Sequence, residues 1–237
     1  MPAAVTVVMV SGFMQPASAW EPVANLLPER YPSVLLDHRE HDYEGRLVEI
    51  AGAGEGAVLM GYSLGGRLLL HAAVRDPRRY RALVTVGSSA GLDVPAERAA
   101  RREADDRLAA WIESTPIEDV VGAWERLPLF ADQADALVAD QRPGRLAQSP
   151  ADLATLLRTA GQGALRPIWR LLPRLERPVL ALSGEHDERY RTAAARIADL
   201  APDAHARTVE DAGHAAHLQQ AEAVAALAVQ FLDENLG

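Results

Sequence analysis

Short runs of mostly apolar residues, each followed by a polar or glycine-containing turn, recur along the chain. The six runs cover residues 5–10, 33–36, 57–60, 83–86, 179–182 and 206–209. Runs of this length and composition are typical of strands buried on both faces of a parallel sheet. Helical patterns lie between or after them, at residues 67–75, 192–200 and 221–232. The alternation predicts an α/β fold with a doubly wound, mostly parallel sheet.

One long segment interrupts this alternation. Between residues 92 and 173 no strand-like run occurs, and prolines separate helical patches rich in Ala, Arg, Leu and Glu. We expect a helical lid over the carboxyl ends of the strands, where such sheets bind ligands. The predicted organisation is therefore a first part of the core at 1–91, the lid at 92–173 and the remaining core at 174–237.

The segment Gly61-Tyr62-Ser63-Leu64-Gly65 lies between the third predicted strand and a predicted helix. This G-x-S-x-G pattern is typical of a sharp strand-to-helix turn that presents a nucleophilic serine, and its glycines avoid clashes with neighbouring backbone. The pattern alone is common, but the strand and the helix around it make it specific. We therefore predict Ser63 as the catalytic centre, against the alternative of an ordinary glycine-rich turn.

A serine hydroxyl needs an imidazole to take its proton, and the imidazole needs an acid to set its tautomer. In chain order the acid and then the histidine follow the serine of such a turn. His214 precedes the last helix, and Asp187 follows the fifth strand. Glu185 in the same loop is the rival acid, and Asp187 is preferred. The backbone amides of Leu64 and Phe13 form the predicted oxyanion hole.

Two pairs of histidines have a spacing that also occurs among metal ligands. His38 and His41 are three residues apart, as are His214 and His217. Neither pair has a third ligand at a spacing typical of zinc sites. We therefore predict no metal and no cofactor, and we interpret His217 as a packing residue or a support for the catalytic histidine.

These motifs resemble those of the α/β-hydrolase superfamily and, within it, the family of 2-succinyl-6-hydroxy-2,4-cyclohexadiene-1-carboxylate synthases of menaquinone biosynthesis. The resemblance covers nearly the whole chain. The similar segments are Gly12-Phe13 with Trp20, the serine turn (the nucleophile elbow, Gly61–Gly65) with Gly66-Arg67, Ser88–Leu92, Glu97–Arg102, Trp124 with Pro128-Leu129-Phe130, Gly184–Tyr190 and Gly213–His217. The resemblance implies the α/β-hydrolase fold. It also implies a lyase that removes a ring proton and expels pyruvate from a succinyl-enolpyruvyl cyclohexene carboxylate.

The chain departs from the pattern of that family at three places. Ser11 replaces a histidine before the first loop, and Glu125 follows Trp124 where an aromatic residue is common. The familiar D-x-P-G-H-G loop is replaced by residues 37–42. These departures bear on the substrate and leave the fold unchanged.

The substrate implied by the resemblance carries three carboxylates, which guanidinium groups bind in bidentate fashion. Arg67 lies one helical turn after Ser63 and can face the same pocket. Arg101 would project from the lid, and Arg142 is the candidate for a third cation. Trp124 is a candidate substrate contact or, equally, the anchor of the lid core. The alternative for the arginines is a solvated surface, since the chain is rich in arginine throughout.

Composition excludes several classes of function. The 237 residues carry a net charge of −9, which disfavours nucleic acids and anionic membranes as partners. The absence of cysteine excludes disulfides, thiolate metal sites and cysteine nucleophiles. No apolar run is long enough to span a membrane, and the first residues lack the basic region of a signal peptide. We expect a cytoplasmic monomer or homo-oligomer that acts on a small anionic molecule.

Two other functions remain open on the sequence alone. A serine hydrolase acting on a small ester, thioester or lactone would use the same three residues through an acyl-enzyme. A binding protein that has lost turnover is the least favoured, because every member of the predicted triad is present in the expected order.

Overall fold

The computed structural model describes residues 4–237 and shows one sheet of six parallel strands. The strands are adjacent in the order β2-β1-β3-β4-β5-β6. Their bounds are β1 Val7–Val10, β2 Ser33–Leu35, β3 Val58–Tyr62, β4 Ala82–Val86, β5 Val179–Gly184 and β6 Ala204–Val209. Every apolar run therefore forms a strand, with ends shifted by no more than two residues. The predicted fold class is confirmed.

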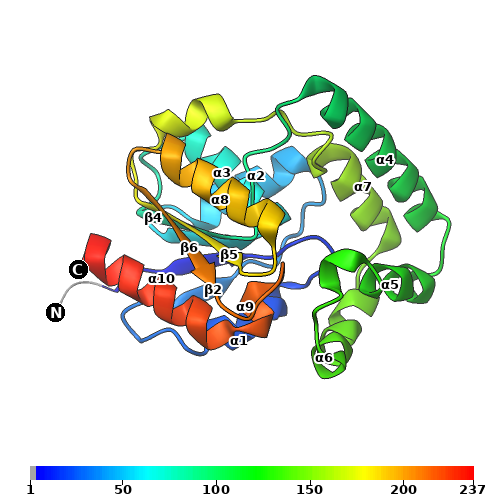
Figure 1. Ribbon diagram of the computed structural model, residues 1–237, viewed down its shortest axis with the longest axis horizontal. Helices are drawn as coiled ribbons and strands as arrows, with labels where there is room; N and C mark the ends of the chain where they lie inside the picture. Colours follow the sequence, from blue (N-terminus) through cyan, green and yellow to red (C-terminus); the bar gives the residue numbers. More distant parts are fainter. Residues whose placement is uncertain (1–3) are drawn as a thin grey trace.

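Helices cover both faces of this sheet (Figure 1). One face carries α2 (Tyr43–Ala53), α3 (Leu64–Arg75) and α8 (Glu188–Leu200). The other carries α1 (Glu21–Ala24), α9 (Ala216–Gln219) and α10 (Ala221–Leu236), with the short 3-10 helix η1 (Ala17–Trp20) beside them.

Successive residues of the central strands point to opposite faces, so each face has its own apolar core. Val8 and Leu59 are buried on the side of α2, α3 and α8, whereas Met9 and Met60 are buried on the side of α1, α9 and α10. This double burial explains why the strands read as continuous apolar runs without polar alternation.

Between β4 and β5 the chain is helical, and we call residues 92–173 the helical insertion. Its elements are α4 Pro95–Glu113, α5 Ile117–Glu125, η2 Pro128–Phe130, α6 Asp135–Leu146, α7 Pro150–Ala160 and, extending just past it, η3 Trp169–Arg174. Its buried residues, among them Ile112 and Leu153, pack around Met14 from the loop after β1. The insertion thus rests on the carboxyl ends of the strands. Across residues 4–237, no helix is both long and apolar enough to cross a bilayer.

Candidate active site

Ser63 occupies the turn between β3 and α3 in a backbone conformation that L-residues rarely adopt. Its φ is 49° and its ψ is −109°. The amide of Ser63 donates to the carbonyl of Val86 at 2.8 Å, and the hydroxyl of Ser88 donates to the carbonyl of Ser63 at 2.9 Å. Strain of this kind persists only where the surrounding structure holds it, and it is common at active sites.

The glycines of this turn lie where no side chain would fit. A Cβ atom on Gly65 would lie 2.3 Å from the carbonyl oxygen of Val10. A Cβ atom on Gly61 would lie 2.7 Å from the backbone nitrogen of Gly66. Both distances are far inside van der Waals contact with backbone atoms, so the close approach of β1, β3 and α3 requires glycine.

Ser63, His214 and Asp187 form a continuous hydrogen-bonded chain. The Oγ of Ser63 lies 3.1 Å from Nε2 of His214, and Nδ1 of His214 lies 2.7 Å from Oδ2 of Asp187. A carboxylate can only accept, so Nδ1 carries the proton and Nε2 is left to accept from the serine hydroxyl. The side chains of His214 and Asp187 are 2% and 5% exposed, which keeps water from competing for these bonds.

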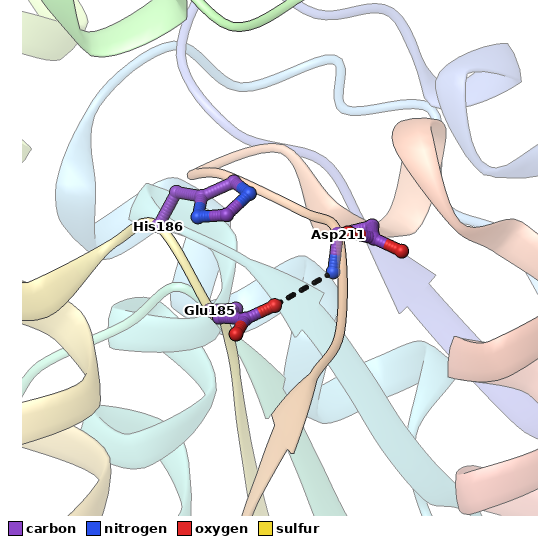
Figure 2. Close-up of side chains that lie close together, drawn as sticks. All are labelled: Glu185, His186 and Asp211. Carbon is purple, nitrogen blue, oxygen red and sulfur yellow. Dashed lines mark hydrogen bonds between the residues drawn. The ribbon is translucent and has the colours of Figure 1, made fainter.

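The structure distinguishes between the two candidate acids. Asp187 is the N-cap of α8, where its Oδ1 accepts from the amide of Tyr190 while its Oδ2 faces His214. Glu185 is exposed, and its carboxylate accepts from the backbone amide of Asp211 (Figure 2). Only Asp187 therefore reaches the imidazole.

A cavity of about 180 Å³ opens beside Ser63. Its walls come from the loops at the carboxyl ends of the strands and from the helical insertion. Aromatic contacts join the two, because the ring of Phe13 lies 5.2 Å from that of Trp124, which lies 5.6 Å from that of Phe130. The predicted site residues that line the cavity are Phe13, Ser63, Leu64, Arg67, Arg101, Trp124, Asp187 and His214.

The two predicted oxyanion donors follow the carboxyl ends of the neighbouring strands β1 and β3. Leu64 is the first residue of α3, where backbone amides have no acceptor within the helix. Phe13 lies in the loop after β1, next to Met14, whose φ of 62° marks a tight turn. Both residues line the cavity.

Arg67 and Arg101 bring guanidinium groups to the cavity in different settings. Arg67 is buried, and its Nη1 donates to the carbonyl of Ala160 at 3.3 Å. Burial lowers the pKa of Arg67 to about 10, so it remains charged at neutral pH. Arg101 pairs at 2.7 Å with the buried Asp105, which also accepts from the amide of Gly163.

Arg142 does not line the cavity, which corrects its interpretation as the third cation of the site. Its guanidinium binds Glu125 of α5, and the same carboxylate accepts from Nη1 of Arg145 at 3.1 Å. Glu125, the residue that departs from the family pattern, thus holds both arginines of α6. The third guanidinium at the cavity belongs to Arg189.

The sequence reasoning missed Arg189, Tyr190 and Gln162 as lining residues of the cavity. Arg189 and Tyr190 lie two and three residues after Asp187, and the ring of Tyr190 lies 4.5 Å from that of His214. Helical geometry could have identified these two residues from the sequence, because the first turn of a helix that begins at Asp187 must lie near Asp187. Gln162 had no such signal, because it lies in a loop after α7.

His217 is completely buried and packs between two aromatic rings. Its ring lies 4.2 Å from that of Tyr62 and 4.7 Å from that of Trp20. Burial, reinforced by the neighbouring His214, lowers the pKa of His217 to about 3, so its ring is neutral. His217 is thus a packing residue beneath the loop that carries His214.

One group of side chains has the composition of a metal site. Glu185, His186 and Asp211 have ligand atoms within 4.8 Å of one another, and all three residues are exposed (Figure 2). The group lies outside the lining of the Ser63 cavity. The other two histidines at metal-like spacing, His38 and His41, face different carboxylates. Nδ1 of His38 lies 2.6 Å from Oε2 of Glu49, and Nε2 of His41 lies 3.5 Å from Oδ2 of Asp152.

Comparison with known proteins places this site in a family. A family model described as alpha/beta hydrolase family matches residues 7–227. The chain therefore belongs to the α/β hydrolase family. Within that family it is similar to the 2-succinyl-6-hydroxy-2,4-cyclohexadiene-1-carboxylate synthase of Enterobacter sp. (strain 638). The two are 30% identical over 95% of this chain and 90% of that protein. The resemblance seen in the motifs is confirmed.

Further relatives and solved structures agree with this placement. A Bacillus subtilis (strain 168) protein is 33% identical over 73% of this chain, and the match spans 65% of that protein's own length. The structure of MenH from S. aureus superposes with a TM-score of 0.93 at 24% identity, covering 100% of this chain and 96% of that one. A thermophilic esterase from Thermogutta terrifontis shares the fold with a TM-score of 0.78 at 21% identity, covering 100% and 92%.

Proposed function

We propose that the protein is a lyase that eliminates pyruvate from a succinyl-enolpyruvyl cyclohexene carboxylate to give 2-succinyl-6-hydroxy-2,4-cyclohexadiene-1-carboxylate. The observation that carries this proposal is the hydrogen-bonded Ser63 in a cavity lined by guanidinium groups. A basic lining in a chain of net charge −9 favours an anionic substrate. The relatives from Enterobacter and Klebsiella pneumoniae are named for the same product.

In this proposal Ser63 acts as the base through His214. As Oγ of Ser63 takes a proton from a ring carbon of the substrate, its own proton passes to Nε2 of His214, and Asp187 stabilises the imidazolium. The electron pair left on the carbon forms the new double bond, and the bond from the ring to the enolpyruvyl oxygen breaks. The enolpyruvate released takes up on its methylene carbon the proton held by His214, which gives pyruvate and restores the neutral imidazole.

The cavity supplies positive charge where the reaction places negative charge. Arg67 and Arg101 would bind substrate carboxylates, and charge-assisted bonds in a buried site are stronger than in water. The amides of Leu64 and Phe13 would bind an oxygen that gains charge as the proton leaves. The helical insertion provides Arg101 and Trp124, so we assign it the role of a lid that excludes water.

Hydrolysis of a small ester is the second candidate, because the same serine and histidine suit attack on a carbonyl. The serine stands at a strained elbow of the kind that serine hydrolases use. A neutral ester, however, would leave Arg67 and Arg189 without an anionic partner among the residues described. The basic lining therefore favours the elimination.

The experiment adds the purified protein to the enolpyruvyl precursor and follows pyruvate with lactate dehydrogenase and NADH. We expect release far above the spontaneous rate and its loss in Ser63→Ala. Release at the spontaneous rate by folded protein would overturn the proposal. A burst of p-nitrophenol from short esters, with fluorophosphonate labelling of Ser63, would favour the hydrolase instead.

A further inference from the structure

The first turn of α8 brings the guanidinium group of Arg189 to the cavity beside Ser63. Its Nη2 donates to Oε1 of Gln162 at 3.0 Å, and in the described part of the chain no carboxylate pairs with it. Arg189 is exposed, whereas Arg67 is buried. Arg189 therefore offers an uncompensated charge at the solvent side of the same cavity.

Gln162 connects this guanidinium to a second donor. It is buried, and while its Oε1 accepts from Arg189, its Nε2 donates to the hydroxyl of Tyr190 at 2.8 Å. Because the Tyr190 oxygen accepts that bond, its own proton is free to be donated. Tyr190 also lines the cavity. One amide thus orients two donors, a guanidinium and a phenol, toward the same space.

The lining of the cavity carries more positive than negative charge, which favours a multiply charged anion. Of its three guanidinium groups, only that of Arg101 has a carboxylate partner, Asp105, among the residues described. All three guanidinium groups line this one cavity, so their positive charges repel one another there. The carboxylate of the lining, Asp187, is engaged with His214. A bound dicarboxylate would relieve this repulsion.

We propose that Arg189 and Tyr190 bind the carboxylate at the end of the succinyl arm of the substrate, with Gln162 as their positioning residue. This rests on the proposed function, whose product carries such an arm. The arm is the flexible part of that molecule and ends in a carboxylate, so it suits the exposed side of the cavity. The guanidinium fork and the phenol then donate to one carboxylate together.

The test measures binding without turnover, by calorimetry on the whole protein. The probes are 2-(3-carboxypropanoyl)benzoate, an aromatic analogue with a succinyl arm, and 2-butanoylbenzoate, which lacks the carboxylate of the arm. We expect Arg189→Met to weaken the first probe about tenfold, the size typical of one charged hydrogen bond, and to leave the second within about twofold. Arg191→Met is the matched control, because Arg191 lies on the same helix, binds the carbonyl of Glu185 and does not line the cavity.

The role of Gln162 is tested by a double-mutant cycle. We expect Gln162→Leu to weaken binding of the dicarboxylate, and to weaken it less when Arg189→Met is already present, because the part of its effect that acts through Arg189 is then already lost. Arg189→Lys should restore part of the affinity, since it keeps the charge but not the fork. Additive losses in the cycle would overturn the positioning role. Thermal unfolding of each variant confirms that it is folded.

The subsite and the proposed reaction fail in different ways. Equal weakening of both probes by Arg189→Met, or a wild type that binds them equally well, would overturn the subsite whatever the pyruvate assay shows. Selective weakening in a protein that releases no pyruvate would keep the subsite and overturn the reaction.

Discussion

Asp187 holds His214 with one carboxylate oxygen, Oδ2 at 2.7 Å from Nδ1, and uses the other to cap α8. The cap accepts from the amide of Tyr190. One side chain therefore joins the geometry of the imidazole to the start of a helix that also carries two lining residues of the cavity. Because each task uses a different oxygen, substitution can separate them.

Asp187→Asn should abolish most activity with little loss of stability. The amide oxygen still caps α8, but the amide nitrogen then faces Nδ1 and imposes the wrong tautomer on His214. We expect kcat for pyruvate release to fall by about 10³–10⁴, as in other triads. Asp187→Ala, which also removes the cap, should lower the free energy of unfolding by about 1 kcal/mol more. A kcat for Asp187→Asn within tenfold of wild type would contradict this interpretation.

Arg101→Ala should affect both substrate binding and stability. We expect KM for the enolpyruvyl precursor to rise about tenfold or more, and the free energy of unfolding to fall by about 1–3 kcal/mol because Asp105 is left buried without its cation. Adding Asp105→Asn should recover stability but not KM. Arg102→Ala is the matched control, because it breaks an exposed pair at the same helical spacing. Recovery of KM together with stability would show that Arg101 is only structural.

Glu125 and Arg142 should differ sharply as sites of substitution. The side chains of Glu125 and Arg145 are 9% and 3% exposed, whereas that of Arg142 is 42% exposed. Glu125→Ala leaves the Arg145 charge buried and should lower the free energy of unfolding by about 3–5 kcal/mol in urea. Arg142→Ala should cost less than about 1 kcal/mol and leave KM unchanged. A large rise in KM for Arg142→Ala would contradict this prediction and show that Arg142 binds the substrate.

His217 should make the protein less stable in mild acid. In the unfolded chain its pKa is 6.5, and burial lowers it to about 3 in the folded protein. The unfolded state alone therefore binds a proton between these values, so stability is full above pH 6.5 and is lost as the pH falls toward 3. We expect His217→Phe to reduce the loss of unfolding free energy between pH 7.5 and 5.0 by about 2 kcal/mol. His205→Gln, at the exposed His205 side chain, is the control. An unchanged difference in His217→Phe would contradict the assignment.

Two glycine substitutions should have opposite effects. Gly65→Ala places a Cβ 2.3 Å from the backbone oxygen of Val10, so the elbow must shift and both stability and kcat should fall. Gly52 lies in α2, and a Cβ atom on it would meet nothing within 4 Å. Gly52→Ala should raise the free energy of unfolding by up to about 1 kcal/mol, with kcat unchanged. Thermal unfolding measures the stability of each variant, and the pyruvate assay measures its kcat. A fully active Gly65→Ala would contradict the steric account.

Some parts of the site follow from residues that are neighbours in the chain. The elbow is one, because strand, turn and helix are continuous and the crowding at Gly65 follows from the turn itself. Asp187 and His214 are similar, since each lies in the loop that follows the carboxyl end of a predicted strand. Parallel strands end at one edge of the sheet, so residues 151 positions apart, such as Ser63 and His214, meet there.

The choice between Arg142 and Arg189 could not be made in this way. Both are long cationic side chains on helices, and the direction of each depends on how its helix packs. Arg142 turns to Glu125 of a neighbouring helix, whereas Arg189 turns to Gln162, a partner 27 residues away in a loop. Neither pairing follows a periodicity or a motif spacing in the sequence, so neither partner could be predicted from it.

The sequence by itself determined the strands, the elbow and the order of Ser63, Asp187 and His214, because these depend on local backbone preference and on burial. The tertiary structure alone decided which charges reach the cavity and that Gln162 joins Arg189 to Tyr190. The physical reason is the distance along the chain over which each feature is determined. A strand or turn is encoded by adjacent residues, whereas a long polar side chain takes whichever partner the packing of distant segments brings within hydrogen-bonding distance.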